Sequence, residues 1–325
     1  NLLVLAKRGE LAIASENVYH HIASFHLHTM QPFGDLFLTD DLWGASSDKG
    51  KPADAAGLKY AYPDDPVIDF VYRNIVKGND YEVSDLYRTY TYTNGLVNCW
   101  VGQDWSGPDD WNAHARQNLT QHSEPLARHF NYTNVVTARS DWQKDAAYLY
   151  FLPRLHGGHV SPARGTFVYS ALGRDWSRYP LGHNHKSSLQ HSVITVDGQS
   201  ASTGPGRIVH FDSTDRRTLA ACDLRHTYAN QPLAPHNEER RTRAPEPWYD
   251  LPSWQNPHWL TGDRPAHRSG PEKSRLPSVR EAYRAVSLVK QNPEQPYALI
   301  VDRMRMDNLS HHYLWQLVLP NDLKE

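Results

Sequence analysis

The sequence lacks any apolar run near the roughly 20 residues that a membrane-spanning helix requires, so no membrane span is predicted. It also lacks a dominant charge, because 34 lysine and arginine residues are balanced by 36 acidic residues, for a net charge of −2. A nucleic-acid binder normally carries a basic field or patch, so no nucleic-acid partner is predicted. Only two cysteines are present, Cys99 and Cys222. Their spacing leaves both a disulfide and two free thiols open.

Hydrophobic residues are also scarce, at 39% of the chain, but the sequence holds 18 tyrosines and 10 tryptophans. Aromatic side chains with a polar edge suit the flat face of a sugar ring, although core packing accounts for most of them. Three N-x-S/T triplets, at Asn118, Asn131 and Asn308, permit glycosylation in a secreted protein. The chain begins at Asn1 without methionine, so we expect a processed or partial chain.

The first 75 residues or so are predicted to be mainly helical. Val18, Ile22 and Phe25 follow one another at helical spacing. Asp64-Asp65-Pro66 is typical of a helix start, and that helix is predicted to run through Val67–Val76 and end near Gly78. A domain boundary is predicted between about 105 and 130.

From Asn134 onward the pattern changes to short β-prone runs separated by turns. The predicted strands are 135–139, 147–152, 166–172, 192–196, 207–211, 218–223, 282–289, 297–302 and 312–319. This many short strands without intervening helices predicts an antiparallel β-sandwich. Residues 230–278 interrupt the pattern with prolines, arginines and three tryptophans. We interpret them as an ordered aromatic lid over a binding groove, with a disordered insertion as the alternative.

Histidines gather around two of these runs. Five of them, at positions 156, 159, 183, 185 and 191, lie within His156–Gly198. This density indicates a polar site at one end of a sheet; solvated loop histidines are the alternative. His159 and His191 stand beside predicted strands and are the stronger candidates.

Five segments, taken in order, resemble the heparinase II/III-like family of polysaccharide lyases. They are Asn134–Arg139 with Asp145–Phe151, Gly158-His159 with Gly165–Phe167, His191–Gly198, Thr218–Tyr228, and Arg284–Val286 with Tyr297–Asp302. The His191 run is the most specific, being similar to the family's His-Asn-Thr-Val-x-Val-Asp-Gly. The resemblance implies an α+β chain, in which a helical remnant of an α/α toroid (1–120) precedes an antiparallel β-sandwich (121–325) with a Trp- and Pro-rich insertion at about 230–278.

Such lyases cut uronate-containing anionic polysaccharides by β-elimination. The reaction needs carboxylate neutralisation, a base near the acidic carbon and an acid for the leaving oxygen. His159 stands at the family's sandwich histidine and is the predicted catalytic residue. Arg139 is predicted to bind a substrate carboxylate, and Trp248 and Trp254 to contact sugar rings. No cofactor is required for this chemistry.

The resemblance also bears on a structural divalent metal, zinc or calcium. Ser161 and Ala163 stand where the family commonly has a histidine and an aspartate. Asp175 and His191 approximately match the other two ligand positions, and His183 or His185 could replace the missing ligand.

The toroid's catalytic residues find no clear match. Tyr19, His20, His21, His26 and His28 form the nearest cluster, and we expect packing rather than catalysis from it. Two functions therefore stand: a secreted or periplasmic lyase, or a lyase-derived extracellular glycan-binding or structural protein without turnover, as a homo-oligomer or part of an assembly. A helical sugar hydrolase would need two carboxylates across a cleft, and Asp40-Asp41 and Asp64-Asp65 are better explained as caps or turns.

Overall fold

The computed structural model describes residues 16–32, 59, 62–71, 73, 111–131, 133–153, 163–178, 188, 191–197, 206–229, 279–292 and 294–320. The chain divides into two compact units. The first comprises residues 1–126 and 141–146, and the second comprises residues 127–140 and 147–325. Each unit is described separately below.

The first unit is helical in its described part. It contains α2 (Glu16–Thr29), α5 (Pro66–Val71), α8 (Trp111–Ala115) and the π-helical turn η3 (Arg116–Thr120). Their apolar side chains form one core with Trp142: Ala23, Leu27, Met30, Val67, Ile68, Phe70, Val71, Ala115 and Leu119. No helix in the described ranges is long and apolar enough to cross a membrane.

The helix predicted to start at Asp64-Asp65-Pro66 is confirmed at its N-terminus. The carboxylate Oδ1 of Asp65 accepts hydrogen bonds from the backbone N–H groups of Val67 and Ile68, at 2.9 Å each. This cap satisfies two of the donors that a helix start leaves unpaired. The predicted extension of the helix to Gly78 lies beyond the described residues.

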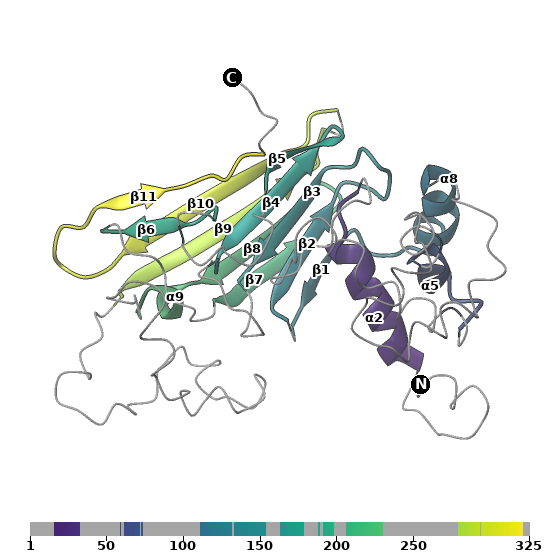
Figure 1. The fold of residues 1–325 in the computed structure, drawn as a ribbon, viewed down its shortest axis with the longest axis horizontal. Coiled ribbons are helices and arrows are strands. Elements are labelled where there is room, and N and C mark those ends of the chain that lie inside the picture. Colours follow the sequence, from purple (N-terminus) through teal and green to yellow (C-terminus); the bar gives the residue numbers. More distant parts are fainter. Residues whose placement is uncertain are drawn as a thin grey trace, which may run out of the picture. The chain divides into compact units, whose positions relative to one another are not determined.

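The second unit contains a five-stranded antiparallel sheet in the order β1-β2-β3-β4-β5. Its strands are β1 (Ala127–Phe130), β2 (Val135–Arg139), β3 (Tyr148–Leu152), β4 (Thr166–Ala171) and β5 (Arg174–Ser177). Each strand pairs with the next one in the sequence, as Figure 1 shows in blue to teal. The strands predicted for β2, β3 and β4 are confirmed, whereas β1 and β5 were not predicted.

A second antiparallel sheet has four strands in the order β10-β9-β8-β7 (Figure 1). Its strands are β7 (Arg207–Ser213), β8 (Arg217–Asp223), β9 (Glu281–Val289) and β10 (Tyr297–Arg305). A separate pair joins β6 (Ile194–Val196) to β11 (Tyr313–Trp315). The expectation that no helix intervenes is wrong, because α9 (Arg225–Ala229) follows β8. The Asp223 carboxylate accepts the Arg225 N–H at 2.9 Å, which favours a helical turn there.

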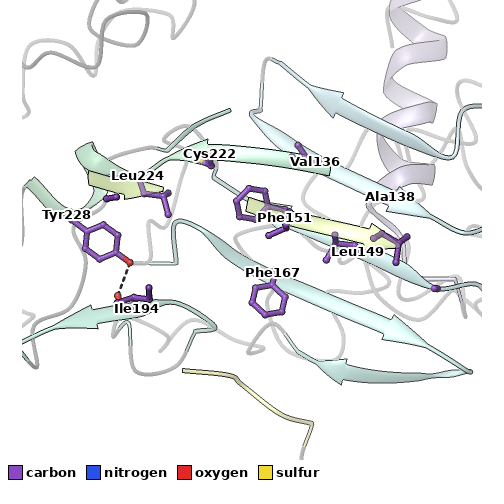
Figure 2. Packing of buried hydrophobic residues seen from close by; sticks show 14 of the residues in the cluster. Val136, Ala138, Leu149, Phe151, Phe167, Ile194, Cys222, Leu224 and Tyr228 are labelled. Carbon is purple, nitrogen blue, oxygen red and sulfur yellow. Dashed lines mark hydrogen bonds between the residues drawn. The ribbon is translucent and has the colours of Figure 1, made fainter. Parts of the chain in front are cut away.

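One apolar core joins the two sheets and β6, which makes the second unit a β-sandwich. Phe151 and Phe167 come from the first sheet, and Cys222, Val286 and Leu288 come from the second. Figure 2 shows such side chains packed between strands of both sheets. The Tyr228 hydroxyl donates to the Ile194 carbonyl at 2.8 Å, so this buried polar atom is satisfied (Figure 2).

Candidate functional site

The outer face of the central strands of the five-stranded sheet is buried and carries polar side chains. Strands β2 and β3 are buried along their whole length. Only alternate residues, such as Ala138 and Leu149, belong to the sandwich core. Because successive side chains of a strand point to opposite faces, the residues between them lie on the outer face. That face is therefore a second buried layer, distinct from the sandwich core.

Four polar residues form a row across this outer face. The strand register places Arg139 opposite Tyr148, Tyr148 opposite Ser170, and Ser170 opposite Asp175. We call these four residues the polar row. Neighbouring strands lie about 4.8 Å apart, so the row extends over roughly 14 Å. Two residues selected from the sequence, Arg139 and Asp175, thus stand at opposite ends of one row.

Side chains within the row contact one another in two pairs. The guanidinium carbon of Arg139 lies 4.7 Å from the centre of the Tyr148 ring, a cation–π distance. The Ser170 hydroxyl donates to Asp175 Oδ1 at 2.6 Å. Burial raises the pKa of the Tyr148 phenol, and the charge of Arg139 only partly opposes this shift. Tyr148 therefore stays protonated near neutral pH, so its hydroxyl can donate a hydrogen bond but cannot act as a phenolate base.

A second cluster surrounds the first residue of β4. The Thr166 hydroxyl oxygen accepts the backbone N–H of Ser192 at 3.1 Å. Nη1 of Arg284 donates to the carbonyls of Gly165 and Ser192, at 2.7 Å each. These bonds hold the segment before β6 against the start of β4. They also place His191, which directly precedes Ser192, beside the same end of the sheet.

His191 itself is fully buried. Its backbone N–H donates to the Ser188 carbonyl at 3.1 Å, and its carbonyl accepts the Val193 N–H at 2.9 Å. These two bonds fix the backbone of a tight bend directly before β6. The backbone that carries the His191 ring is consequently held in place by hydrogen bonds on both sides.

His159, the predicted catalytic residue, lies outside the described residues. The described residues on either side of it, however, are firmly anchored. The N–H of Gly165 donates to the Leu152 carbonyl at 2.8 Å, and the N–H of Gly206 donates to the Pro153 carbonyl at 2.9 Å. The connection that contains His159 therefore leaves β3 and returns to β4 at the end of the sheet where His191 is held.

Asp175 and His191, the predicted metal ligands, lie beside opposite ends of β4. Asp175 is paired with Ser170, and His191 adjoins the residue that bonds Thr166. Four residues of strand separate these positions, which corresponds to about 13 Å. Within the described ranges, no three His, Cys, Asp or Glu side chains form a group that could hold a metal ion.

The helical unit has its own carboxylate cluster, centred on Glu124. Glu124 Oε1 accepts the Ser24 hydroxyl at 3.0 Å and lies 3.2 Å from Nε2 of His28. Nδ1 of His20 lies 2.9 Å from Asp65 Oδ2. His28 also packs edge-to-face on Trp142, with ring centres 5.1 Å apart. These contacts bind helix α2 to its neighbours, and sequence reasoning missed Glu124 because no motif marks it.

Asp69 is the second buried carboxylate of the helical unit. Burial disfavours its ionised form, but hydrogen bonds from His114, Lys59 and Arg73 outweigh this effect and hold its pKa well below the usual range. The carboxylate is therefore a permanent anion that joins α5 to α8. It belongs to packing, and it has no free proton to transfer near neutral pH.

Trp248 and Trp254, like His183 and His185, lie outside the described residues, so their positions stay predictions. The same holds for Ser161. Ala163 is described and fully buried. Sequence reasoning missed Tyr148 and Ser170. Alternation of side chains along β3 and β4 places both residues on one face of the sheet. Their alignment with Arg139 follows only from the strand register, which the sequence does not reveal.

No family model and no curated protein matches the chain. Among solved structures, the heparan sulfate lyase HepC from Pedobacter heparinus is 14% identical, with a TM-score of 0.44. A heparinase III is 10% identical with a TM-score of 0.49, and a heparinase III with methylated lysines is 12% identical with a TM-score of 0.49. The alignments cover 89%, 90% and 91% of this chain, but only 32%, 35% and 33% of those structures. The chain thus spans about a third of their length.

Proposed function

We propose that this protein is polysaccharide lyase-like and engages a uronate-containing anionic glycan beside the five-stranded sheet. The observation that carries the proposal is the contact between Arg139 and Tyr148. These residues come from two segments that resemble consecutive sandwich strands of heparinase II/III-like lyases. They are neighbours on one face of the sheet, and both bear groups that can donate hydrogen bonds to an acidic sugar.

The proposed reaction is β-elimination at the uronate. A base removes the proton next to the carboxylate, the bond to the glycosidic oxygen breaks, and a carbon–carbon double bond forms in the new end residue. The leaving oxygen takes up a proton. We assign the transfer of the first proton to His159, since an unperturbed imidazole has a pKa of about 6.5 and is partly neutral near pH 7.

Arg139 is assigned to neutralising the substrate carboxylate, which lowers the barrier to carbanion formation. Its side chain is fully buried. The assignment therefore requires that the glycan displace present neighbours of the guanidinium. Trp248 and Trp254 are assigned to stacking on sugar rings. Asp175 and His191 are proposed to hold the two ends of β4 in place, each through bonds of its own segment, rather than to share one metal ion.

The test of turnover is ultraviolet absorbance of the unsaturated uronate on incubation with alginate, heparan sulfate, chondroitin sulfate and ulvan. Absorbance should rise with one of them. His159→Ala should lower the rate about 100- to 10,000-fold, the usual contribution of a general acid or base. His210→Ala is the matched control, because His210 is an exposed histidine on β7 of the other sheet. Equal rates for the two variants would remove His159 from the mechanism.

The second candidate is glycan binding without turnover, and the substitution of Ser161 and Ala163 for the family's usual residues favours it. In that case no polysaccharide would produce the absorbance change. Affinity electrophoresis would still show retardation in a gel containing the glycan. Trp248→Ala and Trp254→Ala should reduce that retardation in either case, and unchanged migration would remove both tryptophans from the site.

A further inference from the structure

Within the described part of the chain, strand β10 forms a long, apolar edge of the four-stranded sheet. It has nine residues, and among the described strands it pairs with β9 alone. Its outward side chains include Tyr297, Leu299 and Val301, which are 54%, 50% and 54% exposed. A long exposed edge with apolar side chains favours pairing with another strand. We propose that β10 pairs antiparallel with β10 of a second copy of this chain, across a two-fold axis at Val301.

The hydrogen-bonding groups of β10 are oriented for such pairing. The Leu224 N–H donates to the Ala282 carbonyl, and the Lys290 N–H donates to the Arg216 carbonyl. The backbone groups of the even-numbered residues of β9 therefore bond to β8. In an antiparallel ladder these directions alternate, so the odd-numbered residues of β9 bond to β10. Their partners on β10 are odd-numbered as well. The N–H and C=O groups of Ala298, Ile300, Asp302 and Met304 therefore point away from the sheet.

The register follows from using the whole strand. When all nine residues of both copies pair, Ile300 meets Asp302 of the second copy and Ala298 meets Met304 of the second copy. All four are residues whose backbone groups point outward, so every outer pair is hydrogen-bonded. A shift of the register by two residues in one direction would place Asp302 of one chain opposite Asp302 of the second copy, which sets two like charges together. A shift in the other direction would leave two residues of each strand unpaired.

The side chains are self-complementary in this register. Tyr297 faces Arg305 of the second copy, which permits a cation–π contact, and Leu299 lies against the methylene groups of Arg303 of the second copy. No like charges oppose each other. Two charged side chains of β10 are also already paired within the chain, because Arg284 binds Asp302 and Glu281 binds Arg303 at 2.8 Å.

Apolar surface continues beside the edge. Trp315, which is 46% exposed, donates its indole N–H to Asp302 at 3.0 Å and so lies against β10. Tyr313 and Leu314, which lie with Trp315 on β11, are exposed as well. A second copy paired at this edge would lie beside part of this surface. The polar row lies on β2 to β5 and not on β10, so this proposal is independent of the proposed lyase-like function.

The first test is sedimentation velocity over a range of protein concentrations. The unsubstituted protein should reach twice the mass of one chain, and Val301→Lys, which sets two lysines together at the axis, should remain at one chain mass. Val209→Lys is the matched control, because Val209 is a 46% exposed valine on β7, the other edge of the same sheet. It should dimerise like the unsubstituted protein. A single-chain mass for the unsubstituted protein at every concentration, or equal effects of both lysines, overturns the proposal.

The second test fixes the register. Residues that face each other in a non-hydrogen-bonded antiparallel pair have Cα atoms about 4.5 Å apart, which permits a disulfide. Val301→Cys should therefore give a covalent dimer under mild oxidation, above the background of the unsubstituted protein. Leu299→Cys and Val209→Cys should not, whereas a mixture of Leu299→Cys and Arg303→Cys chains should. Cross-linking of Val301→Cys no greater than that of Val209→Cys overturns the proposal, even if Val301→Lys fails to fold.

Discussion

The Arg284 guanidinium forms a bidentate ion pair with the Asp302 carboxylate. Nε lies 2.7 Å from Oδ1, and Nη2 lies 2.9 Å from Oδ2. The two residues face each other on β9 and β10. The third nitrogen of Arg284 donates to two backbone carbonyls, those of Gly165 and Ser192. One buried side chain thus joins the second sheet to the start of β4 and to the bend before β6.

Arg284→Met should destabilise the sandwich unit by about 3–5 kcal/mol, because it leaves a largely buried carboxylate and two carbonyls without their donor. The exposed fractions are 2% for the side chain of Arg284 and 14% for that of Asp302. Urea unfolding measures the change in free energy. Arg217→Met, which removes an exposed ion pair with Asp212 at 3.8 Å, should leave the midpoint unchanged. Equal shifts for the two variants would contradict the assigned role.

Gly165→Ala should be more damaging than Gly173→Ala. Both glycines have positive φ angles, +86° and +73°, so alanine at either position is strained by about 1–2 kcal/mol. A Cβ on Gly165 would also lie 2.8 Å from Leu224 Cδ1, whereas a Cβ on Gly173 meets nothing within 4 Å. Overpacking should add about 1–3 kcal/mol at Gly165 only. Thermal unfolding of the two variants compares them directly, and equal losses would show that Leu224 moves aside freely.

His311 should make the β6–β11 pair sensitive to alkaline pH. Its ring nitrogens lie 2.6 Å from Asp197 Oδ2 and 2.9 Å from Asp307 Oδ1. Hydrogen bonds to Asp197 and then Asp307 raise the pKa of His311 above its ordinary value. The stabilisation is therefore fully present below the unfolded-state pKa of about 6.5 and is lost as pH rises through the higher folded-state value.

The pH dependence of the stability of the β6–β11 pair can be measured by amide hydrogen exchange of both strands, corrected for intrinsic exchange rates. Protection should fall as pH rises through the folded-state pKa of His311, and His311→Gln should show low protection throughout. The two carboxylates determine the behaviour at acidic pH. The hydrogen bond from His311 lowers the pKa of Asp197, and hydrogen bonds from the Leu309 N–H and then His311 lower the pKa of Asp307. Their contribution is lost at acidic pH. A profile unchanged by His311→Gln would rule out the ring as its cause.

The Cys222 thiol should not react with iodoacetamide in the native protein. It is free and fully buried in the sandwich core, and burial raises its pKa well above the ordinary value. Only the thiolate reacts, so both access and ionisation are suppressed. Mass spectrometry of alkylated protein should find Cys222 unmodified until urea unfolds the chain. Rapid native labelling would show that the core opens locally around β8.

The sandwich could be predicted because its central strands carry strong local signals. The β-branched and aromatic residues of Val135–Arg139 and Tyr148–Leu152 mark strands whatever their surroundings. The strands β1 (ARHF) and β5 (RDWS) were missed since short, polar edge strands gain their structure from pairing rather than from propensity. Strand β10 extends three residues beyond the predicted end at Asp302, because its final Arg-Met-Arg alternates between solvent and core.

The candidate site was less predictable than the fold. Arg139 and Asp175 were selected singly, but their presence in one row depends on the register of four strands, which turns and bulges determine. A bulge between Tyr169 and Ser170 shifts the register at the end of the row that holds Asp175. The separation of Asp175 from His191 likewise depends on the length of β4, and local spacing in the sequence does not reveal it.

The sheet order has a consequence for how the chain emerges from a ribosome. Strands β1 to β5 pair with sequential neighbours, so this sheet can assemble hairpin by hairpin during synthesis. Its apolar inner face, however, is covered only in part, by β7 and β8, until β9 is translated, because β8 and β9 lie about 60 residues apart in the chain. The nascent chain therefore exposes the part of this apolar surface that β9 later covers for several seconds at ordinary elongation rates.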